Sequence, residues 1–156
     1  MTYVSGPMST DQHEALPIIY RWLDDTFHGV RFSGTFVLVP LPPDTPFMVG
    51  AYDAPVSGRL LDIRSPVLRG VNRTSRLSEL ISENDGLADE GYVRVLPRAS
   101  EVHVADLEIR YTIAANTMNR DSLVQLGLRM SLAADRIGRM LQPEFGGSLV
   151  KSPPQP

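Results

Sequence analysis

The chain has no cysteine, which excludes disulfide bridges, thiol catalysis and metal sites built from cysteine ligands. No apolar run reaches the length of about 18 residues that a membrane-spanning helix needs. The opening residues, MTYVSGPMSTDQHE, lack the basic and apolar segments of a secretory signal peptide. We therefore expect a cytoplasmic protein without a membrane span.

A strong charge of either sign is also missing. The 15 Lys and Arg residues, of which Lys151 is the single lysine, face 18 Asp and Glu residues, so the net charge is −3. This balance does not predict binding to nucleic acid. With 156 residues, 42% of them hydrophobic, the chain is typical of one globular domain. We expect a flexible N-terminus over 1–9, a single domain over 10–147 and a Pro-rich flexible tail over 148–156.

Motifs for catalysis and for cofactors are absent as well. The chain contains no HExxH, GxGxxG, GxxxxGK[ST] or GxSxG sequence. His13, His28 and His103 have no neighbour at metal-site spacing, so each is interpreted as an ordinary helix or strand residue. We predict no catalytic, cofactor-binding or metal-binding residue and no cofactor. An enzyme assembled from scattered residues stays open, and a polar pocket holding His28 or His103 beside a carboxylate would indicate one.

The clearest pattern that is present lies between residues 107 and 141. Apolar and polar residues alternate through LEIRYTI, which is typical of a half-buried strand. After Asn119, which can cap a helix, apolar residues recur every three or four positions, as in an amphipathic helix. The members of this stripe are Leu123, Leu126, Met130, Ala133, Ile137 and Leu141. Gly127 beside it either permits a close crossing or is simply tolerated.

The remaining elements follow from the same two periodicities. We predict a helix within 10–27, strands over 30–41, 47–52 and 59–69, a helix over 75–83, and strands over 92–96 and 101–113. Pro66 places the third strand at an edge or breaks it. The apolar phase changes within 101–113, which predicts a bulge or break near Ala105 and Asp106. The order is typical of an α+β fold, an antiparallel sheet of about five strands with helices on one face.

Two charged pairs lie on predicted strands at i, i+2 spacing. Asp62 and Arg64 share one face of their strand, as do Glu108 and Arg110 on a later one. Such pairs are typical of the solvated side of a sheet. They indicate surface charge and require no catalytic role.

The strand over 30–41 is apolar on both faces, which predicts that both its sides are covered. Helices on one side of the sheet would leave a second apolar face for a partner or a second subunit. We predict that this face carries Val37, Val39 and Ile63 and that these residues bind the partner.

The element order and the sequence LAADRIGRML resemble the type III secretion chaperone and YbjN-like superfamily. The matching positions of its closing helix are Leu126, Leu132, Ala133, Ala134, Asp135 and Arg136. The resemblance implies a small domain that forms a homodimer and binds extended segments of another protein without catalysis. Two features depart from the superfamily: the charge is only mildly negative, and residues 101–105 lengthen the region between the last two strands.

A second function class is compatible with the same observations. A small α+β domain with Pro-rich ends and no catalytic motif also suits a structural assembly subunit, such as a viral or phage matrix or head–tail component. Large regular oligomers would favour this alternative over a discrete dimer.

Overall fold

The structure is a computed structural model that describes residues 12–83, 88 and 90–153. Its helices are α1 (Gln12–Asp24), α2 (Ser75–Glu83), the short 3-10 helix η1 (Ala115–Thr117) and α3 (Arg120–Phe145). Its strands are β1 (Arg31–Ser33), β2 (Phe36–Leu41), β3 (Asp44–Ala54), β4 (Gly58–Asn72), β5 (Tyr92–Arg98), β6 (Glu101–Ala114) and β7 (Ser148–Leu149). Within these described ranges, no helix is long and apolar enough to cross a membrane.

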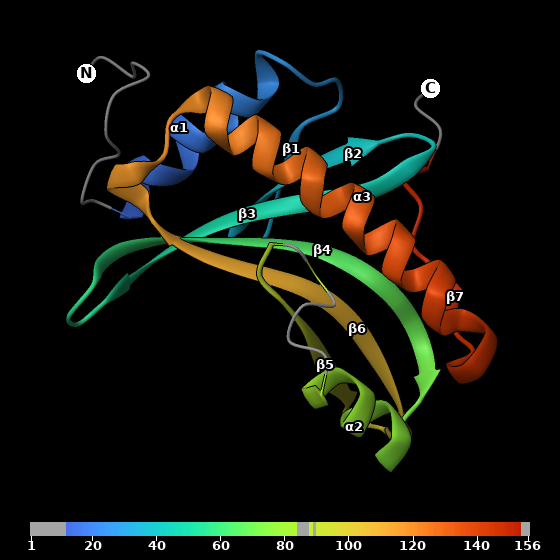
Figure 1. The fold of residues 1–156 in the computed structure, drawn as a ribbon. Coiled ribbons are helices and arrows are strands. Elements are labelled where there is room, and N and C mark those ends of the chain that lie inside the picture. Colours follow the sequence, from blue (N-terminus) through green and yellow to red (C-terminus); the bar gives the residue numbers. More distant parts are fainter. Residues whose placement is uncertain (1–11, 84–87, 89, 154–156) are drawn as a thin grey trace.

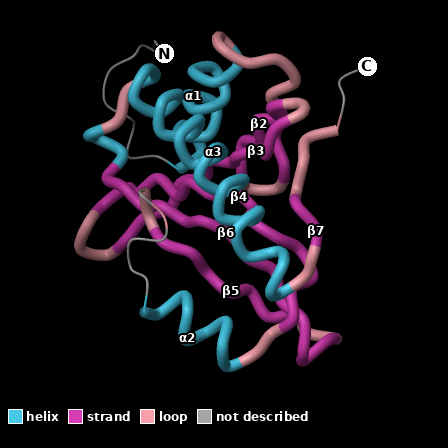
Figure 2. The backbone as a smooth tube through the Cα atoms, turned by 45° about the vertical axis from the view of Figure 1, so that its right-hand side comes forward, coloured by secondary structure: helices cyan, strands magenta, loops and turns pink. Residues whose placement is uncertain are grey.

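The strands form one antiparallel sheet in the order β1-β2-β3-β4-β6-β5, with β7 paired to β4. Figures 1 and 2 show α1 and α3 lying over one face of this sheet, while the long strands β4 and β6 curve away from them. The α+β class is therefore confirmed. The sheet has seven strands rather than about five.

The first predicted strand, over 30–41, is in fact a tight hairpin. Ser33 pairs with Phe36, so Gly34 and Thr35 alone form the turn between β1 and β2. Gly34 has a φ of +61°, a conformation that glycine adopts without strain. The sequence analysis treated 30–41 as one strand because strand periodicity alone does not show where a hairpin reverses.

Helix α3 begins and packs as the sequence predicts. The Asn119 side chain accepts a hydrogen bond from the Ser122 N–H at 2.9 Å, which caps the helix. Its predicted apolar stripe is buried against the sheet. A Cβ atom on Gly127 would lie 2.3 Å from the Phe47 ring, so the helix crosses β3 at van der Waals contact. Of the two roles considered for Gly127, the close crossing is therefore confirmed.

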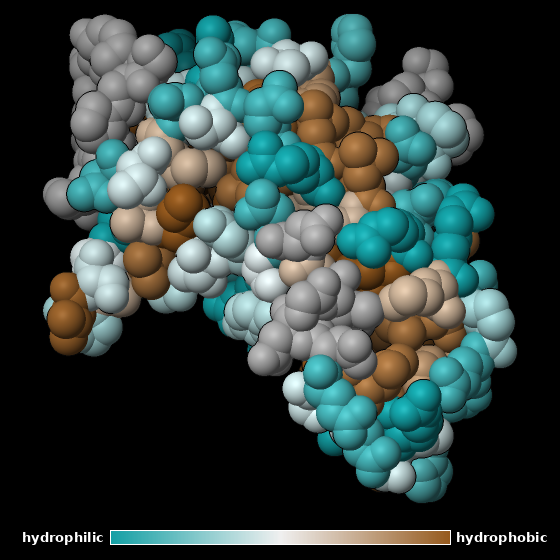
Figure 3. All heavy atoms as spheres, viewed as in Figure 1, coloured by the Kyte–Doolittle hydropathy of each residue, from teal (hydrophilic) through white to brown (hydrophobic). Residues whose placement is uncertain are grey.

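Helix α2 also has its predicted bounds, 75–83, and contributes Leu77 to the core. An ion pair of 3.3 Å between Arg76 and Glu144 joins it to the last turn of α3. In the view of Figure 3, hydrophilic side chains spread over the helices and apolar ones form smaller patches between them. The exposed apolar side chains of α3 are Leu132 and Met140.

The pairing of β6 is irregular beside the predicted bulge near Ala105 and Asp106. Pro97 of β5 pairs with Ala105 but Arg98 pairs with Glu101, so β6 carries extra residues between these two positions. The odd-numbered residues of β6 from Ala105 to Ile109 are buried. On its other side the pairing shifts within β4, between Pro66 and Leu68 and again before Val71. The apolar phase was misleading because Val102 is 72% exposed and does not belong to the core.

Two prolines separate β3 from β4 at one end of the sheet. Regular pairing of these strands stops at Met48 and Arg64, just before Pro46 and Pro66. Proline has no N–H to donate, so neither strand can extend the ladder there. The hydroxyl of Ser65 donates to the Pro46 carbonyl at 2.8 Å. β4 is nevertheless a central strand that continues through Pro66, so the prediction of an edge strand is wrong; the pairing with β6 becomes irregular just after Pro66 instead.

The C-terminal segment lies in the opening that this separation leaves. β7 pairs with Leu68 and Arg69 of β4, and the Ser152 N–H donates to the Asp44 carbonyl at 2.9 Å. Ser148, Leu149 and Ser152 are therefore bonded to the sheet, within the range over which the sequence predicts a flexible tail. Prolines exclude a helix there but are compatible with an extended segment. The predicted flexible residues 1–9 lie outside the described residues.

Candidate functional site

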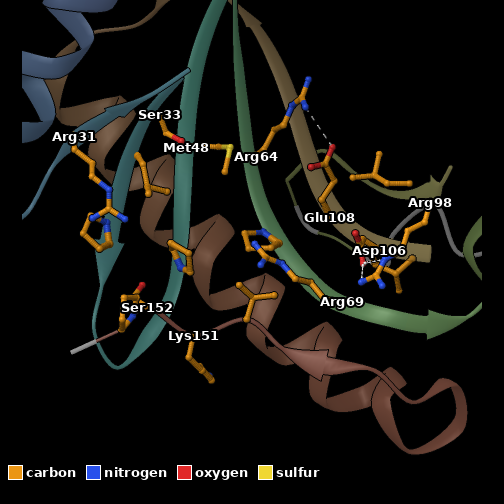
Figure 4. Close-up of a pocket in the computed structure, with 18 residues that line it drawn as sticks. Arg31, Ser33, Met48, Arg64, Arg69, Arg98, Asp106, Glu108, Lys151 and Ser152 are labelled. Carbon is orange, nitrogen blue, oxygen red and sulfur yellow. Dashed lines mark hydrogen bonds and ion pairs between the residues drawn. The ribbon is translucent and has the colours of Figure 1, made fainter. Parts of the chain in front are cut away.

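A groove crosses the face of the sheet that α1 and α3 leave open (Figure 4). It encloses about 690 Å³ and is lined by residues of every strand from β1 to β5 in the sheet order. Its floor is apolar and rich in proline, formed by Leu38, Pro40, Pro46, Met48, Pro66 and Leu96. Pro46 and Pro66, which lie where the pairing of β3 and β4 stops, both line the groove.

The C-terminal segment forms one wall of this groove. Val150, Lys151, Ser152 and Pro153 all line it. The Leu41 N–H donates to the Ser152 hydroxyl at 2.9 Å, and Ser152 is 5% exposed. Lys151 bonds to Asp135 on α3. The wall is thus held to the β2–β3 turn and to the helix layer.

The lining contains more basic than acidic side chains. Arginine and lysine contribute five residues, namely Arg31, Arg64, Arg69, Arg98 and Lys151, whereas the acidic ones are Asp106 and Glu108. The chain as a whole carries a net charge of −3. The groove is therefore a locally basic site on an acidic protein.

Asp106 neutralises one of these arginines. Its carboxylate accepts a hydrogen bond from Arg98 Nη2 at 2.8 Å and another from the Gly70 N–H at 3.0 Å. Burial alone would raise the pKa of Asp106, but these two hydrogen bonds and the charge of Arg69 hold it below its ordinary value. Asp106 is thus an ionised anchor that also satisfies the backbone at the bulge of β4.

Arg31 and Arg69 differ from the other three basic residues. Neither side chain forms a hydrogen bond or an ion pair with any residue in the described part of the chain. Both are exposed. Figure 4 shows them on opposite sides of the groove, Arg31 from β1 and Arg69 from the end of β4.

A buried charge network adjoins the groove on the same face. Asp62, which is 4% exposed, accepts hydrogen bonds from Arg64 Nη2 at 2.7 Å and from Arg110 Nε at 2.9 Å. A second hollow of about 380 Å³ lies beside it, and Arg64 stacks over the Phe36 ring at 4.9 Å. The sequence pairs interpreted as separate surface charges are therefore one network, because Arg64 pairs directly with Arg110 across β4 and β6.

Glu108 lies between the groove and this network. Its Oε1 atom has no hydrogen-bond partner among the described residues, and the nearest cations are Arg94 Nη1 at 3.8 Å and Arg64 Nη1 at 3.9 Å. Burial raises the pKa of Glu108 above its ordinary value, against the opposing charges of Arg64 and Arg94. Among the described residues, Glu108 Oε1 is thus a buried carboxylate oxygen without a hydrogen bond.

The predicted partner-binding residues do not lie in the groove. Val37, Val39 and Ile63 are each 0% exposed and belong to the core between the sheet and the helices. The expectation that they lie on an open face is wrong. Val37 pairs with Val49 and Val39 with Phe47, and Phe47 packs on α3. The odd-numbered residues Val37 and Val39 of β2 therefore face the helices.

The open face instead carries the alternate residues of the same strands, such as Leu38 and Met48. Sequence reasoning did not assign them because β2 is apolar on both faces. The two prolines, Pro46 and Pro66, could have indicated the groove, because neither can donate a hydrogen bond to a neighbouring strand.

The histidines give no support to a catalytic pocket. His28 and His103 are exposed and neither lines the groove. His13 lies in α1, and its side chain is outside the described residues. Over residues 12–83, 88 and 90–153, no cluster of three or more His, Cys, Asp or Glu residues is placed to hold a metal.

Comparisons with known proteins show a likeness of fold alone. No family model matches the chain, and no curated protein is similar to it at a significant level. Among solved structures, the chain is similar to YbjN from E. coli, a proposed transcription regulator, with a TM-score of 0.55 and 10% sequence identity. The match covers 87% of this chain and 95% of that one. The predicted YbjN-like fold is therefore confirmed.

Proposed function

We propose that this domain binds an extended segment of another protein in the open-face groove, without catalysis. The observation that carries the proposal is the groove itself, a concave, proline-lined apolar floor between basic side chains. Small ligand sites and peptide sites share this design of an apolar floor with a few placed polar groups.

The dimensions of the groove favour an extended chain. Its lining runs from β1 to β5 across the sheet. Six neighbouring strands at a spacing of about 4.8 Å span roughly 24 Å, which an extended segment of about seven residues would cross. The floor of Leu38, Met48 and Leu96 offers contacts to apolar side chains along that path.

A chaperone-like role and a homodimer belong to the same proposal. They follow from the resemblance to type III secretion chaperones, and the fold shared with YbjN is compatible with them. Light scattering on the purified chain tests the dimer. A ladder of large, concentration-dependent oligomers would favour the assembly-subunit alternative instead.

The function is tested by obstructing the groove. We expect labelled apolar peptides of about ten residues to bind in fluorescence anisotropy, and Met48→Trp to weaken the tightest of them at least about tenfold. Met140→Trp is the matched control, because Met140 is exposed on α3 outside the groove. Leu38→Ser, which removes floor contacts without adding bulk, is the second variant. Absence of binding to every peptide, or equal binding by Met48→Trp, would overturn the proposal.

A further inference from the structure

We infer that the groove selects an acidic segment, one whose carboxylates flank an apolar anchor; the inference rests on the proposed function. Its motivating observation is charge complementarity. The lining carries five basic and two acidic side chains on a protein whose net charge is −3. A locally basic site on an acidic surface attracts anionic partners selectively.

The lining divides into neutralised and available cations. Arg64 is held by Asp62, Arg98 by Asp106 and Lys151 by Asp135. Arg31 and Arg69 form no hydrogen bond or ion pair with the described residues and are exposed. The charge of Arg69 acts on Asp106 without a hydrogen bond, and Arg31 has no carboxylate partner among the described residues. An acidic ligand would supply hydrogen-bonded carboxylates to both, since arginine binds carboxylates in a bidentate manner.

The positions of these two arginines define the spacing of the ligand. Figure 4 shows Arg31 on β1 and Arg69 on β4, with Met48 of β3 on the sheet between these strands. Leu38 and Met48 lie on the strands between β1 and β4. A segment that places an apolar side chain on Leu38 and Met48 would therefore direct one carboxylate toward Arg31 and another toward Arg69.

A polypeptide fits the site better than a nucleic acid does. Among the described residues no aromatic side chain lines the groove, so it offers no surface on which a base could stack.

The test compares three labelled peptides that share one apolar pattern. They carry Asp and Glu, the matching amides Asn and Gln, or Lys at the polar positions, and a single-stranded oligonucleotide is the fourth probe. We expect the acidic peptide to bind about tenfold more tightly than the amide peptide, with the lysine peptide weakest and salt reducing the difference.

The arginines are tested by charge removal. Arg31→Gln and Arg69→Gln should each weaken the acidic peptide about threefold and the double variant about tenfold, leaving the amide peptide unchanged. Arg73→Gln is the matched control, since Arg73 is exposed and does not line the groove. Circular dichroism verifies folding of each variant.

The outcomes separate the two proposals. If all three peptides bind equally and Met48→Trp still weakens them, the acidic selection is wrong while the proposed function stands. If no peptide binds, both are wrong. Tighter binding of the oligonucleotide that depends on Arg31 and Arg69 would overturn the acidic-segment inference in favour of a nucleic-acid site.

Discussion

The two faces of the sheet are built from the same strands but by different rules. The covered face is apolar and close-packed, with Gly127 of α3 in contact with the Phe47 ring. The open face carries prolines, a buried carboxylate held by two arginines, and two arginines with no partner among the described residues. The comparison indicates that stability resides mainly on one face, which leaves the other free to depart from ideal packing and to bind.

The largest expected effect comes from Gly127→Ala on the covered face. Its methyl group would overlap the Phe47 ring, and overpacking of this kind typically costs about 1–3 kcal/mol. We expect a loss of unfolding free energy near the top of that range in urea denaturation, despite the better helix propensity of alanine. Phe47→Leu combined with Gly127→Ala should lose less than the sum of the single changes. A Gly127→Ala variant at least as stable as the original would contradict the close crossing.

An intermediate effect is expected from Asp62→Asn on the open face. The change leaves Arg64 and Arg110 without their shared carboxylate in a site that is 4% exposed at Asp62, at a cost of about 2 kcal/mol. Glu144→Gln is the control, because its pair with Arg76 is exposed and should contribute under about 0.5 kcal/mol. Similar losses in both variants would show that the network contributes no more than a surface pair.

The smallest effect concerns Glu108 and is visible as a pH dependence. Burial raises the pKa of this carboxyl above its ordinary value of 4.5. At a pH between the ordinary pKa of the unfolded chain and the raised pKa of the folded protein, Glu108 is protonated in the folded state and ionised in the unfolded state. The contribution of Glu108 to the free energy of unfolding therefore falls as pH rises. Below the ordinary value the two states bind the proton alike.

Glu108→Gln has no such dependence. We therefore expect its stability relative to the original chain to be more favourable at about pH 8 than at about pH 4.5, by less than about 1 kcal/mol. Paired urea titrations at the two pH values measure this difference, in which the other carboxyls cancel. A difference that is flat, or that grows toward acid, would be inconsistent with a destabilising buried carboxylate.

Local signals predicted the elements that local interactions form. The bounds of α2, the Asn119 cap and the apolar stripe of α3 follow from spacing within one segment, and all agree with the structure. The hairpin at Gly34 was missed because β1 has only three residues and the apolar run of β2 follows the turn directly. Strand periodicity likewise identified two faces for β2 without showing which one the helices cover.

The groove could not be predicted from the sequence for a related reason. Its lining joins residues as far apart in the chain as Arg31 and Ser152, and only the strand order brings them together. Asp62 and Arg110 are 48 positions apart, and register alone places them in one network. Pro66 was interpreted alone, although Pro46 lies opposite it where the pairing of β3 and β4 stops.

The bound C-terminal segment has a practical consequence for linked ligands. Ser152 fixes this end of the described chain at the groove wall, so a sequence joined there through a short linker starts beside the site. Its effective concentration at the groove would reach the millimolar range, enough to occupy the site even when the free peptide binds weakly. Fusing a weak ligand to this end is thus a way to hold it in the groove for structure determination. An acidic tag fused at the same end would compete with added peptides for the groove.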